Sequence, residues 1–367
     1  MTAAIVRLDT RMLRAPLLRP WGPDVLDLTI VEVVVEDADG AVGHGFSWTP
    51  TIGGHAVQAL LDHEIRDFAL GRPADAEAIW TDLWLRLHEA GGGGLTTIAM
   101  AGLDLALWDL AGRRAGLPVA DLLGRRRAET TAYGSGVNLH YPLDELVAQA
   151  ERWVAAGFGG VKVKVGSPDL ARDVERIRAV REVLGPDRFL AIDANQRWTL
   201  DEADRAIGEL AQFDLRWIEE PLRADDLPGH VALRERIGDL GVPIALGENV
   251  HTRYRFAEFL AAGAVDVAQP NIVRVGGITP FRRIAELADR HGVEVAPHLL
   301  LELSGQLAMA LPHETLVESV EDASFADLGI LAEDAPVIVD RGRARDTRRP
   351  GLGIRFQDAP AHPNRRT

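Results

Sequence analysis

Between about residues 132 and 318, the chain alternates short apolar runs with segments of helical pattern. Regular strand–helix alternation indicates a parallel sheet, because each helix returns the chain to begin the next strand in the same direction. About eight such units predict closure into a (β/α) barrel of the α/β class. An open doubly wound sheet is the alternative, although it rarely uses so many equal repeats. After a strand at 159–166, the predicted strands are 188–193, 215–219, 243–247, 265–269, 293–296 and 315–318.

Capping residues mark where several helices of this region begin. We expect Ser167 to cap one helix, with Pro168 at its first helical position. The segment from Thr199 to Glu202 has the pattern of a capping box. Thr279 is expected to cap the helix that ends near residue 291.

The regions before and after this alternating pattern have different predicted secondary structure. The N-terminal region predicts an antiparallel meander at 11–19, 26–36 and 42–46, then helices at 54–69, 74–90 and 96–116. The last helix is apolar on almost every face, which predicts burial between two layers. In the tail we expect 350–354 to pack on the N-terminal region and 364–367 to be disordered. The predicted domains are therefore 1–125, 126–320 and 321–367.

Composition narrows the possible functions. A net charge of −15 and a pI near 5.2 argue against nucleic-acid binding. The absence of cysteine excludes disulfides, thiolate nucleophiles and Cys-based metal sites. Neither a signal peptide nor a membrane-spanning apolar run is visible in the sequence, so we expect a cytoplasmic protein. We also expect a homo-oligomer that acts on a small molecule.

The lysines are the most unusual feature of the composition. The chain has 40 Lys plus Arg, and lysine occurs only at positions 162 and 164. Arginine stays protonated, whereas a lysine can lose its proton when its surroundings depress its pKa. Lys162 and Lys164 alternate with valine on a predicted strand, so they leave the same face and oppose each other's protonation. Two solvated lysines on a polar strand face are the plainer alternative, but the absence of lysine elsewhere favours a base.

Ionisable residues also end the other predicted strands. Because the strands of a barrel end at one face, these side chains are expected to share a cavity. Three neighbouring carboxylates would repel one another unless a hard cation lies between them, Mg²⁺ first and Mn²⁺ or Ca²⁺ less favoured. With a lysine on one side and a histidine on the other, this set suits removal of the proton α to a substrate carboxylate. The residues are Asp193, Glu219 and Glu248, with Lys162, Lys164, Asn271 and His298.

Taken together, these motifs resemble the enolase superfamily, in its mandelate racemase subgroup. The matching segments are Lys162–Lys164, Ile192–Asn195, Trp217–Pro221, Gly247–Asn249, Gln269–Asn271, Gly276–Thr279 and Pro297–His298. The resemblance implies an α+β capping domain over a modified TIM barrel and an enolate intermediate stabilised by Mg²⁺. It also implies that Trp21 and residues 48–55 belong to specificity loops.

The resemblance assigns a role to each site residue. Mg²⁺ would lie on Asp193, Glu219 and Glu248. Lys164 would be the base on one face of the substrate carbon, and Lys162 would lower its pKa and touch the substrate carboxylate. His298 would be the second acid/base, and Glu318 would donate a hydrogen bond to the substrate carboxylate.

Asn271 departs from the subgroup pattern, which has an aspartate that orients the histidine. Asparagine supplies no negative charge to raise the basicity of His298, so it suits a histidine that acts as an acid on a leaving hydroxyl. We therefore favour dehydration of a sugar acid to a 2-keto acid over racemisation or epimerisation of a 2-hydroxy acid. A Schiff-base aldolase that uses Lys164 and a non-catalytic acid-binding barrel are the more distant alternatives. The sequence does not identify the acid.

Overall fold

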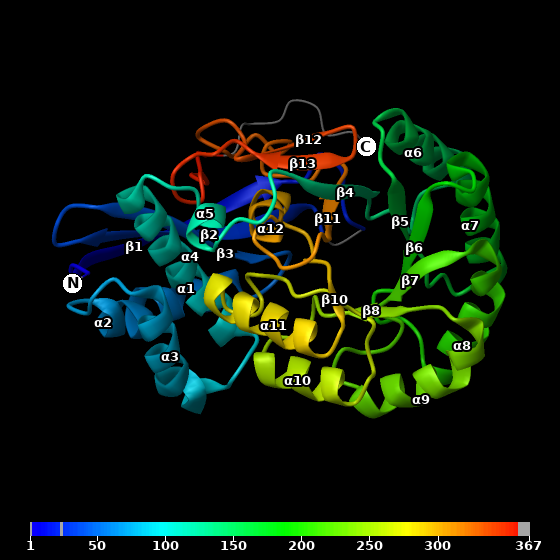
Figure 1. The fold of residues 1–367 in the computed structure, drawn as a ribbon, viewed down its shortest axis with the longest axis horizontal. Coiled ribbons are helices and arrows are strands. Elements are labelled where there is room, and N and C mark those ends of the chain that lie inside the picture. The colour runs from blue at the N-terminus through cyan, green and yellow to red at the C-terminus, as the bar shows by residue number, and fades with distance from the viewer. Residues whose placement is uncertain (1, 23–24, 359–367) are drawn as a thin grey trace.

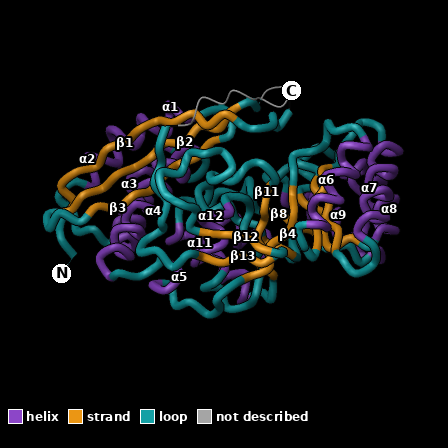
Figure 2. The backbone as a smooth tube through the Cα atoms, turned by 90° about the horizontal axis from the view of Figure 1, so that it is seen from above, coloured by secondary structure: helices purple, strands orange, loops and turns teal. Residues whose placement is uncertain are grey.

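The computed structural model describes residues 2–22 and 25–358, in which an N-terminal domain lies beside a barrel (Figure 1). The expectation of disorder at 364–367 falls outside the described residues. Seen from above, the N-terminal strands lie at one end of the molecule and the barrel helices α6 (Leu143–Ala155), α7 (Leu170–Leu184) and α8 (Leu200–Leu210) lie at the other (Figure 2). The division at residues 125 and 320 stays a proposal.

The N-terminal domain is an antiparallel sheet with helices packed on it, as predicted. Strands β1 (Ile5–Pro16), β2 (Asp27–Asp37) and β3 (Val42–Thr49) pair in that order. The glycines of β3 allow a close approach, since a Cβ on Gly45 would lie 2.3 Å from the backbone of the helix that covers the sheet. The helices are α1 (Gly54–Leu60), which continues through a π-helical turn (Leu61–Ile65) into α2 (Arg66–Ala69), then α3 (Ala76–Leu87), α4 (Leu95–Ala115) and α5 (Val119–Leu122).

Helix α4 is the predicted buried helix. Among the described residues it is the one helix long and apolar enough to cross a membrane, and 83% of its most apolar window is buried inside the protein. Its apolar surface packs on β3 and on the barrel helix α11 (Ile278–Arg290). The helix therefore joins the two domains through its side chains.

The barrel consists of parallel strands with helices outside them (Figure 1). Strand β11 pairs with β4 in parallel, which brings the last strand back to the first and excludes the open doubly wound sheet. Within the described residues no ladder joins β10 to β11, where the Thr315 hydroxyl donates to the Val295 carbonyl instead. The strands are β4 (Thr130–Ser135), β5 (Gly160–Lys164), β6 (Phe189–Asp193), β7 (Leu215–Glu219), β8 (Ile244–Leu246), β9 (Val267–Ala268), β10 (Glu294–Val295) and β11 (Leu316–Val320).

Apolar side chains fill the barrel interior below its carboxyl end. Tyr133 and Trp217 meet edge to face here, with ring centroids 5.6 Å apart. Small residues from the neighbouring strands complete this layer, namely Ala191, Ala245, Val267 and Ala296. The barrel is therefore closed by a solid floor, above which the ionisable residues lie. The remaining helices are α6 (Leu143–Ala155), α7 (Leu170–Leu184), α8 (Leu200–Leu210), α9 (Leu227–Ile237), α10 (Arg253–Ala261) and α12 (Leu301–Ala308).

The C-terminal segment is more regular than its sequence indicated. Strands β12 (Val337–Asp340) and β13 (Arg343–Asp346) form a hairpin, and β13 pairs antiparallel with β4. The expected return to the N-terminal domain is confirmed, because the Leu352 backbone N–H donates to the Asp109 carboxylate of α4 at 2.7 Å.

Two of the predicted helix caps are wrong. Helix α7 begins after Asp169, whose carboxylate accepts from the Ala171 backbone N–H, so Ser167 and Pro168 lie outside it. Helix α11 begins after Gly277, and no side chain of its own segment caps it. The Asp104 carboxylate of α4 accepts the Thr279 backbone N–H at 3.1 Å, so the cap comes from the other domain.

The predicted capping box of helix α8 is confirmed. The Thr199 hydroxyl accepts from the Glu202 backbone N–H, and the Glu202 carboxylate accepts from the Thr199 backbone N–H.

Candidate active site

Strand register brings the predicted catalytic residues together at the carboxyl end of the barrel. Lys164 on β5 lies opposite Asp193 on β6, and Asp193 lies opposite Glu219 on β7. Lys162 and Lys164 are 1% and 8% exposed, which rules out two solvated lysines on a polar face. The alternation of β5 therefore places both ammonium groups inside the barrel, as predicted.

The two lysines bind the carboxylates that surround them. Lys162 Nζ lies 2.6 Å from Glu219 Oε1, 2.9 Å from Glu318 Oε1 and 3.8 Å from Asp193 Oδ2. Lys164 Nζ forms an ion pair with Asp193 Oδ2. The lysine side of the site is thus held by direct ionic hydrogen bonds.

Lys162 lowers the pKa of Lys164, as expected, but the neighbouring carboxylates raise that pKa by more. Burial lowers the pKa of Lys164 and so does the charge of Lys162, yet the Asp193 carboxylate leaves that pKa above its ordinary value. For Lys162, burial is also opposed, and Glu219 and Glu318 hold its pKa well above the ordinary value. The surrounding carboxylates therefore keep both lysines protonated in this arrangement.

Glu219 and Glu248 lie close together at the ends of neighbouring strands. Burial raises the pKa of Glu219 to about 7, although Lys162 lies beside it. Gln269 Nε2 donates to Glu219 Oε2 at 2.7 Å and fixes the carboxylate from the β9 side. Glu248 follows Gly247, whose added Cβ would lie 2.7 Å from the Gln269 backbone, so only glycine fits there.

The site has the charge and ligand types that suit a hard divalent cation. Glu219, Glu248 and His298 place ligand atoms within 4.8 Å of one another. Asp193 adjoins this group in the register, although its Oδ2 is engaged by Lys164. The buried carboxylates Asp193, Glu219, Glu220, Glu248 and Glu318 outnumber the two buried lysines, so a cation would balance them.

His298 lies opposite the lysines and is held by Asn271 and Glu248. Asn271 Nδ2 lies 3.1 Å from His298 Nδ1, and His298 Nε2 lies 2.8 Å from Glu248 Oε2. The Asn271 Oδ1 atom accepts from the backbone N–H groups of Val273 and Arg274, both at 3.1 Å. The amide of Asn271 is therefore fixed with its NH₂ toward the histidine.

Glu318 pairs with Lys162, whereas its expected role was to donate a hydrogen bond to the substrate carboxylate. Its carboxylate accepts from the Ser135 hydroxyl at 2.6 Å and from the Leu299 backbone N–H at 3.0 Å. Burial would raise the pKa of Glu318, but Lys162 and His298 hold it at about 2. An ionised Glu318 accepts hydrogen bonds, so donation to a substrate carboxylate stays a prediction.

Glu220 is buried, although strand alternation after Glu219 predicts that it points outward from β7. It is 1% exposed and accepts from Asn249 Nδ2. Its backbone turns into the left-handed region, with φ of 42°, so the alternation of the strand no longer applies. This turn adds a further buried carboxylate beside Glu248.

Several residues that shape the site were not singled out from the sequence. Asn138 Oδ1 accepts the Lys164 backbone N–H at 3.0 Å, and Arg274 Nη1 donates to Asn249 Oδ1 at 2.5 Å. Each of these side chains follows a barrel strand, as do the predicted residues. A search of strand ends for neutral polar residues and arginine, beyond acids and lysine, would have found them.

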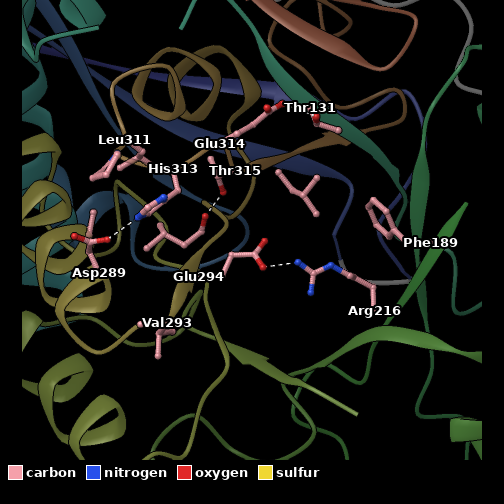
Figure 3. Close-up of a pocket in the computed structure, with 15 residues that line it drawn as sticks. Thr131, Phe189, Arg216, Asp289, Val293, Glu294, Leu311, His313, Glu314 and Thr315 are labelled. Carbon is pink, nitrogen blue, oxygen red and sulfur yellow. Dashed lines mark hydrogen bonds and ion pairs between the residues drawn. The ribbon is translucent and has the colours of Figure 1, made fainter. Parts of the chain in front are cut away.

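A hollow lies at the opposite, amino end of the barrel (Figure 3). This cavity of about 540 Å³ lies beside the gap between β10 and β11 and is lined by Phe189, Val295 and Leu316 among others. Four of its charged groups pair with each other, Arg216 with Glu294 and His313 with Asp289 (Figure 3). None of the predicted site residues lines it.

A parallel barrel with ionisable strand ends and an α+β cap defines a class of two-domain barrel enzymes. Two family descriptions match the chain, "Mandelate racemase / muconate lactonizing enzyme, N-terminal domain" over residues 2–124 and "Enolase C-terminal domain-like" over residues 145–359. The chain therefore belongs to the enolase superfamily, in its mandelate racemase subgroup, which confirms the resemblance and the predicted fold class.

Relatives with known activities cover most of the chain. A 3,6-anhydro-alpha-L-galactonate cycloisomerase of Streptomyces coelicolor is 40% identical over 90% of each chain. An L-talarate/galactarate dehydratase of Salmonella typhimurium is 38% identical over 88% of this chain and 80% of its own. The structure of an L-talarate dehydratase from Polaromonas, complexed with Mg and L-glucarate, superposes with a TM-score of 0.87 at 36% identity and covers 97% of this chain and 96% of that one.

Proposed function

We propose that this protein is a Mg²⁺-dependent lyase that removes the proton α to the carboxylate of a sugar acid and then expels an oxygen from the β carbon. For a free hydroxyl the product is a 2-keto acid and the reaction is a dehydration. The observation that carries this proposal is the hydrogen bonding of Asn271, which fixes the proton of His298.

Asp193, Glu219 and Glu248 would hold the metal. Support comes from their register, from the excess of buried carboxylates and from the magnesium in the Polaromonas relative. Bound Mg²⁺ supplies positive charge to the substrate carboxylate as the α proton leaves. These three assignments rest on oxygen ligands, which Mg²⁺ prefers.

Lys164 takes the α proton in this proposal. It must first lose its own proton, which the neighbouring Lys162 favours and the Asp193 carboxylate opposes. Asn138 holds the backbone of Lys164, and Lys162 would meet the substrate carboxylate while Glu318 anchors it. The end of strand β5 that carries the base is thus held by Asn138 on one side and by strand β6 on the other.

His298 delivers a proton to the leaving oxygen. Because the Asn271 Oδ1 atom is occupied by two backbone N–H groups, its Nδ2–H must donate to His298 Nδ1. The imidazole proton therefore lies on Nε2, in agreement with the Glu248 carboxylate 2.8 Å away. A histidine in this tautomer presents an Nε2–H to the leaving oxygen and has no lone pair at Nε2 to take a carbon-bound proton. Transfer of this proton would leave an imidazolate, whose Nδ1 accepts the Asn271 Nδ2–H.

The bond changes balance without any further reactant. The α C–H and β C–O bonds break, a C=C bond forms between the two carbons, and the resulting enol rearranges to a 2-keto acid. Lys164 takes one proton and His298 returns one to the departing oxygen. Racemisation requires a base on the His298 face, which the tautomer does not provide, so it is the less favoured alternative.

A second candidate follows from the cycloisomerase relative. In a 3,6-anhydro acid the β oxygen belongs to a ring, so the same bond changes open the ring and give an isomer. The identity of 40% over 90% of the chain favours this variant. Each residue keeps its role, because the two reactions differ only in whether the leaving oxygen stays attached to the product.

Turnover in heavy water separates these reactions. Elimination gives a 2-keto acid with Mg²⁺ and none with EDTA, whereas an epimerase returns deuterated substrate without a keto product. A Schiff-base aldolase would be insensitive to EDTA and trapped by borohydride. Absence of any keto acid across open-chain and anhydro acids would overturn the proposal. Cytoplasmic location and a homo-oligomeric state stay predictions, and sedimentation measurements would test the second.

A further inference from the structure

A narrow cleft beside Glu318 is walled by the capping domain. Trp21, Leu28 and Trp48 line it from the N-terminal domain, Leu299 lines it from the barrel, and Phe325 lines it from the C-terminal segment. Leu299 directly follows His298, so the cleft opens beside the proposed acid. Glu318, which also lines the cleft, lies 2.9 Å from Lys162, so the cleft adjoins the residues that would hold a substrate.

Trp48 has an indole N–H without an acceptor. The residue is the last but one of β3, is 2% exposed, and its Nε1 atom is buried with no hydrogen-bond partner in the described structure. The indole nitrogen is a donor only, and a buried donor without an acceptor is unfavourable. An oxygen of a bound ligand would satisfy it.

The cleft admits only a small group. Its volume is about 10 Å³, which is close to the space of a single water oxygen. A hydroxyl or a ring ether oxygen has this size, whereas a carboxylate brings two oxygens and a charge. The size of the cleft thus agrees with the one buried donor without an acceptor among the described side chains that line it.

The charges around the cleft disfavour an anion. Among the described residues that line it, Glu302 and Glu318 are acids and none is basic. Arg274 lies over the Trp48 ring at 5.6 Å, but its guanidinium donates to Asn249 and to Glu248. No lining side chain is therefore free to neutralise a second carboxylate.

The other nearby arginine is also engaged. Arg19 lies 3.6 Å above the Tyr141 ring and forms an ion pair with Glu145. Arg197, on the loop after β6, is exposed. Its side chain packs over Gly166, next to the end of β5, so it lies on the Lys164 side and away from Trp48.

We propose that the Trp48 cleft is a specificity subsite that takes one uncharged oxygen of a monocarboxylic sugar acid, a hydroxyl or a ring ether, and that it selects against dicarboxylic acids. This inference rests on the proposed function and names its substrate class. Trp48 is a specificity-determining residue in this scheme, and the indole N–H is its hydrogen-bond donor.

Matched acid pairs test the subsite. D-galactonate and galactarate, or D-gluconate and D-glucarate, differ only in the group at the far carbon. Binding is measured by calorimetry with the Mg²⁺-loaded Lys164→Ala variant, so the result does not depend on turnover. We expect the monoacid of at least one pair to bind about tenfold or more tightly than its diacid. Tighter binding of the diacids, or binding of none of these acids, would overturn the inference.

Variants of the cleft sharpen the test. Trp48→Phe keeps the ring and removes the donor, so monoacid affinity should fall about tenfold without loss of the fold. Trp108→Phe is the matched control, because the Trp108 indole already donates to Thr279 in the described structure. Ser324→Arg places a cation in the half-buried part of the cleft and should raise diacid affinity.

Two results would contradict the assignment while leaving the proposed function intact. One is unchanged monoacid affinity in Trp48→Phe. The other is a diacid preference that Arg197→Ala abolishes, which would place the second carboxylate on the Lys164 side. Conversely, the unmodified enzyme could bind monoacids selectively and form no keto acid. That result would contradict the proposed function but support the assignment of the subsite.

Discussion

The two ends of the barrel both carry charged groups, yet they differ in how those charges are placed. At the amino end, the Arg216 and Glu294 side chains are 35% and 31% exposed and pair with each other (Figure 3). At the carboxyl end the acids are buried, in register and in excess over the lysines. Uncompensated buried charge marks the chemical site better than open volume does.

The largest difference between the two ends is expected when the proposed base is removed. Lys164→Ala removes the group that takes the α proton, so keto-acid formation should fall by about 10³-fold or more. Arg216→Ala at the amino end is the control and should change kcat less than about twofold. Turnover by Lys164→Ala near the level of the unmodified enzyme would place the base elsewhere.

The metal should bind at the carboxyl end alone. Glu219→Gln and Glu248→Gln each remove one anionic ligand, and Mg²⁺ affinity measured by calorimetry should fall about 100-fold or more. Glu294→Gln removes a carboxylate at the amino end and should leave Mg²⁺ affinity unchanged. If Glu294→Gln weakens Mg²⁺ binding and Glu219→Gln does not, the comparison of the two ends is wrong.

A smaller effect should follow from reversing the tautomer of His298. In Asn271→Asp a carboxylate accepts the Nδ1 proton, which moves the lone pair to Nε2. Elimination should slow about tenfold, while solvent exchange of the α hydrogen from the His298 face should rise. The ¹⁵N shifts of His298 report the tautomer directly. Faster elimination in this variant would refute the role given to Asn271.

The smallest effect concerns stability at the amino end. The Arg216–Glu294 pair is about a third exposed, so solvent screens it, and Glu294→Gln should lower the free energy of unfolding by about 1 kcal/mol or less. Urea unfolding measures this change. A loss of several kcal/mol would show that this pair is as strongly coupled to its surroundings as the pairs at the carboxyl end.

Most of the site could be predicted because strand ends are local features of the sequence. Lys164, Asp193 and Glu219 each close a strand, and parallel pairing in register then brings them together without any further information. The roles were harder to predict than the positions. Lys162, for example, lies 2.9 Å from Glu318, a residue on the last barrel strand that no local window joins to it.

The errors share a physical cause, which is control by distant residues. The cap of α11 comes from Asp104 on another domain, so the local Thr279 signal was misleading. Ser167 donates its backbone N–H to Asp173, which holds the turn before α7 and delays the start of the helix. The hairpin β12–β13 pairs with β4 near Thr131, more than two hundred positions earlier, so its strands gave no local rhythm.

The scarcity of lysine has a practical consequence for labelling. Apart from the chain's amino terminus, Lys162 and Lys164 are the only primary amines in the sequence, and both lie in the site. An amine-selective reagent is therefore a reporter of this cavity, and reductive ¹³C-methylation would give at most two side-chain signals. Those signals would follow metal and ligand binding in the unmodified sequence, without an engineered probe.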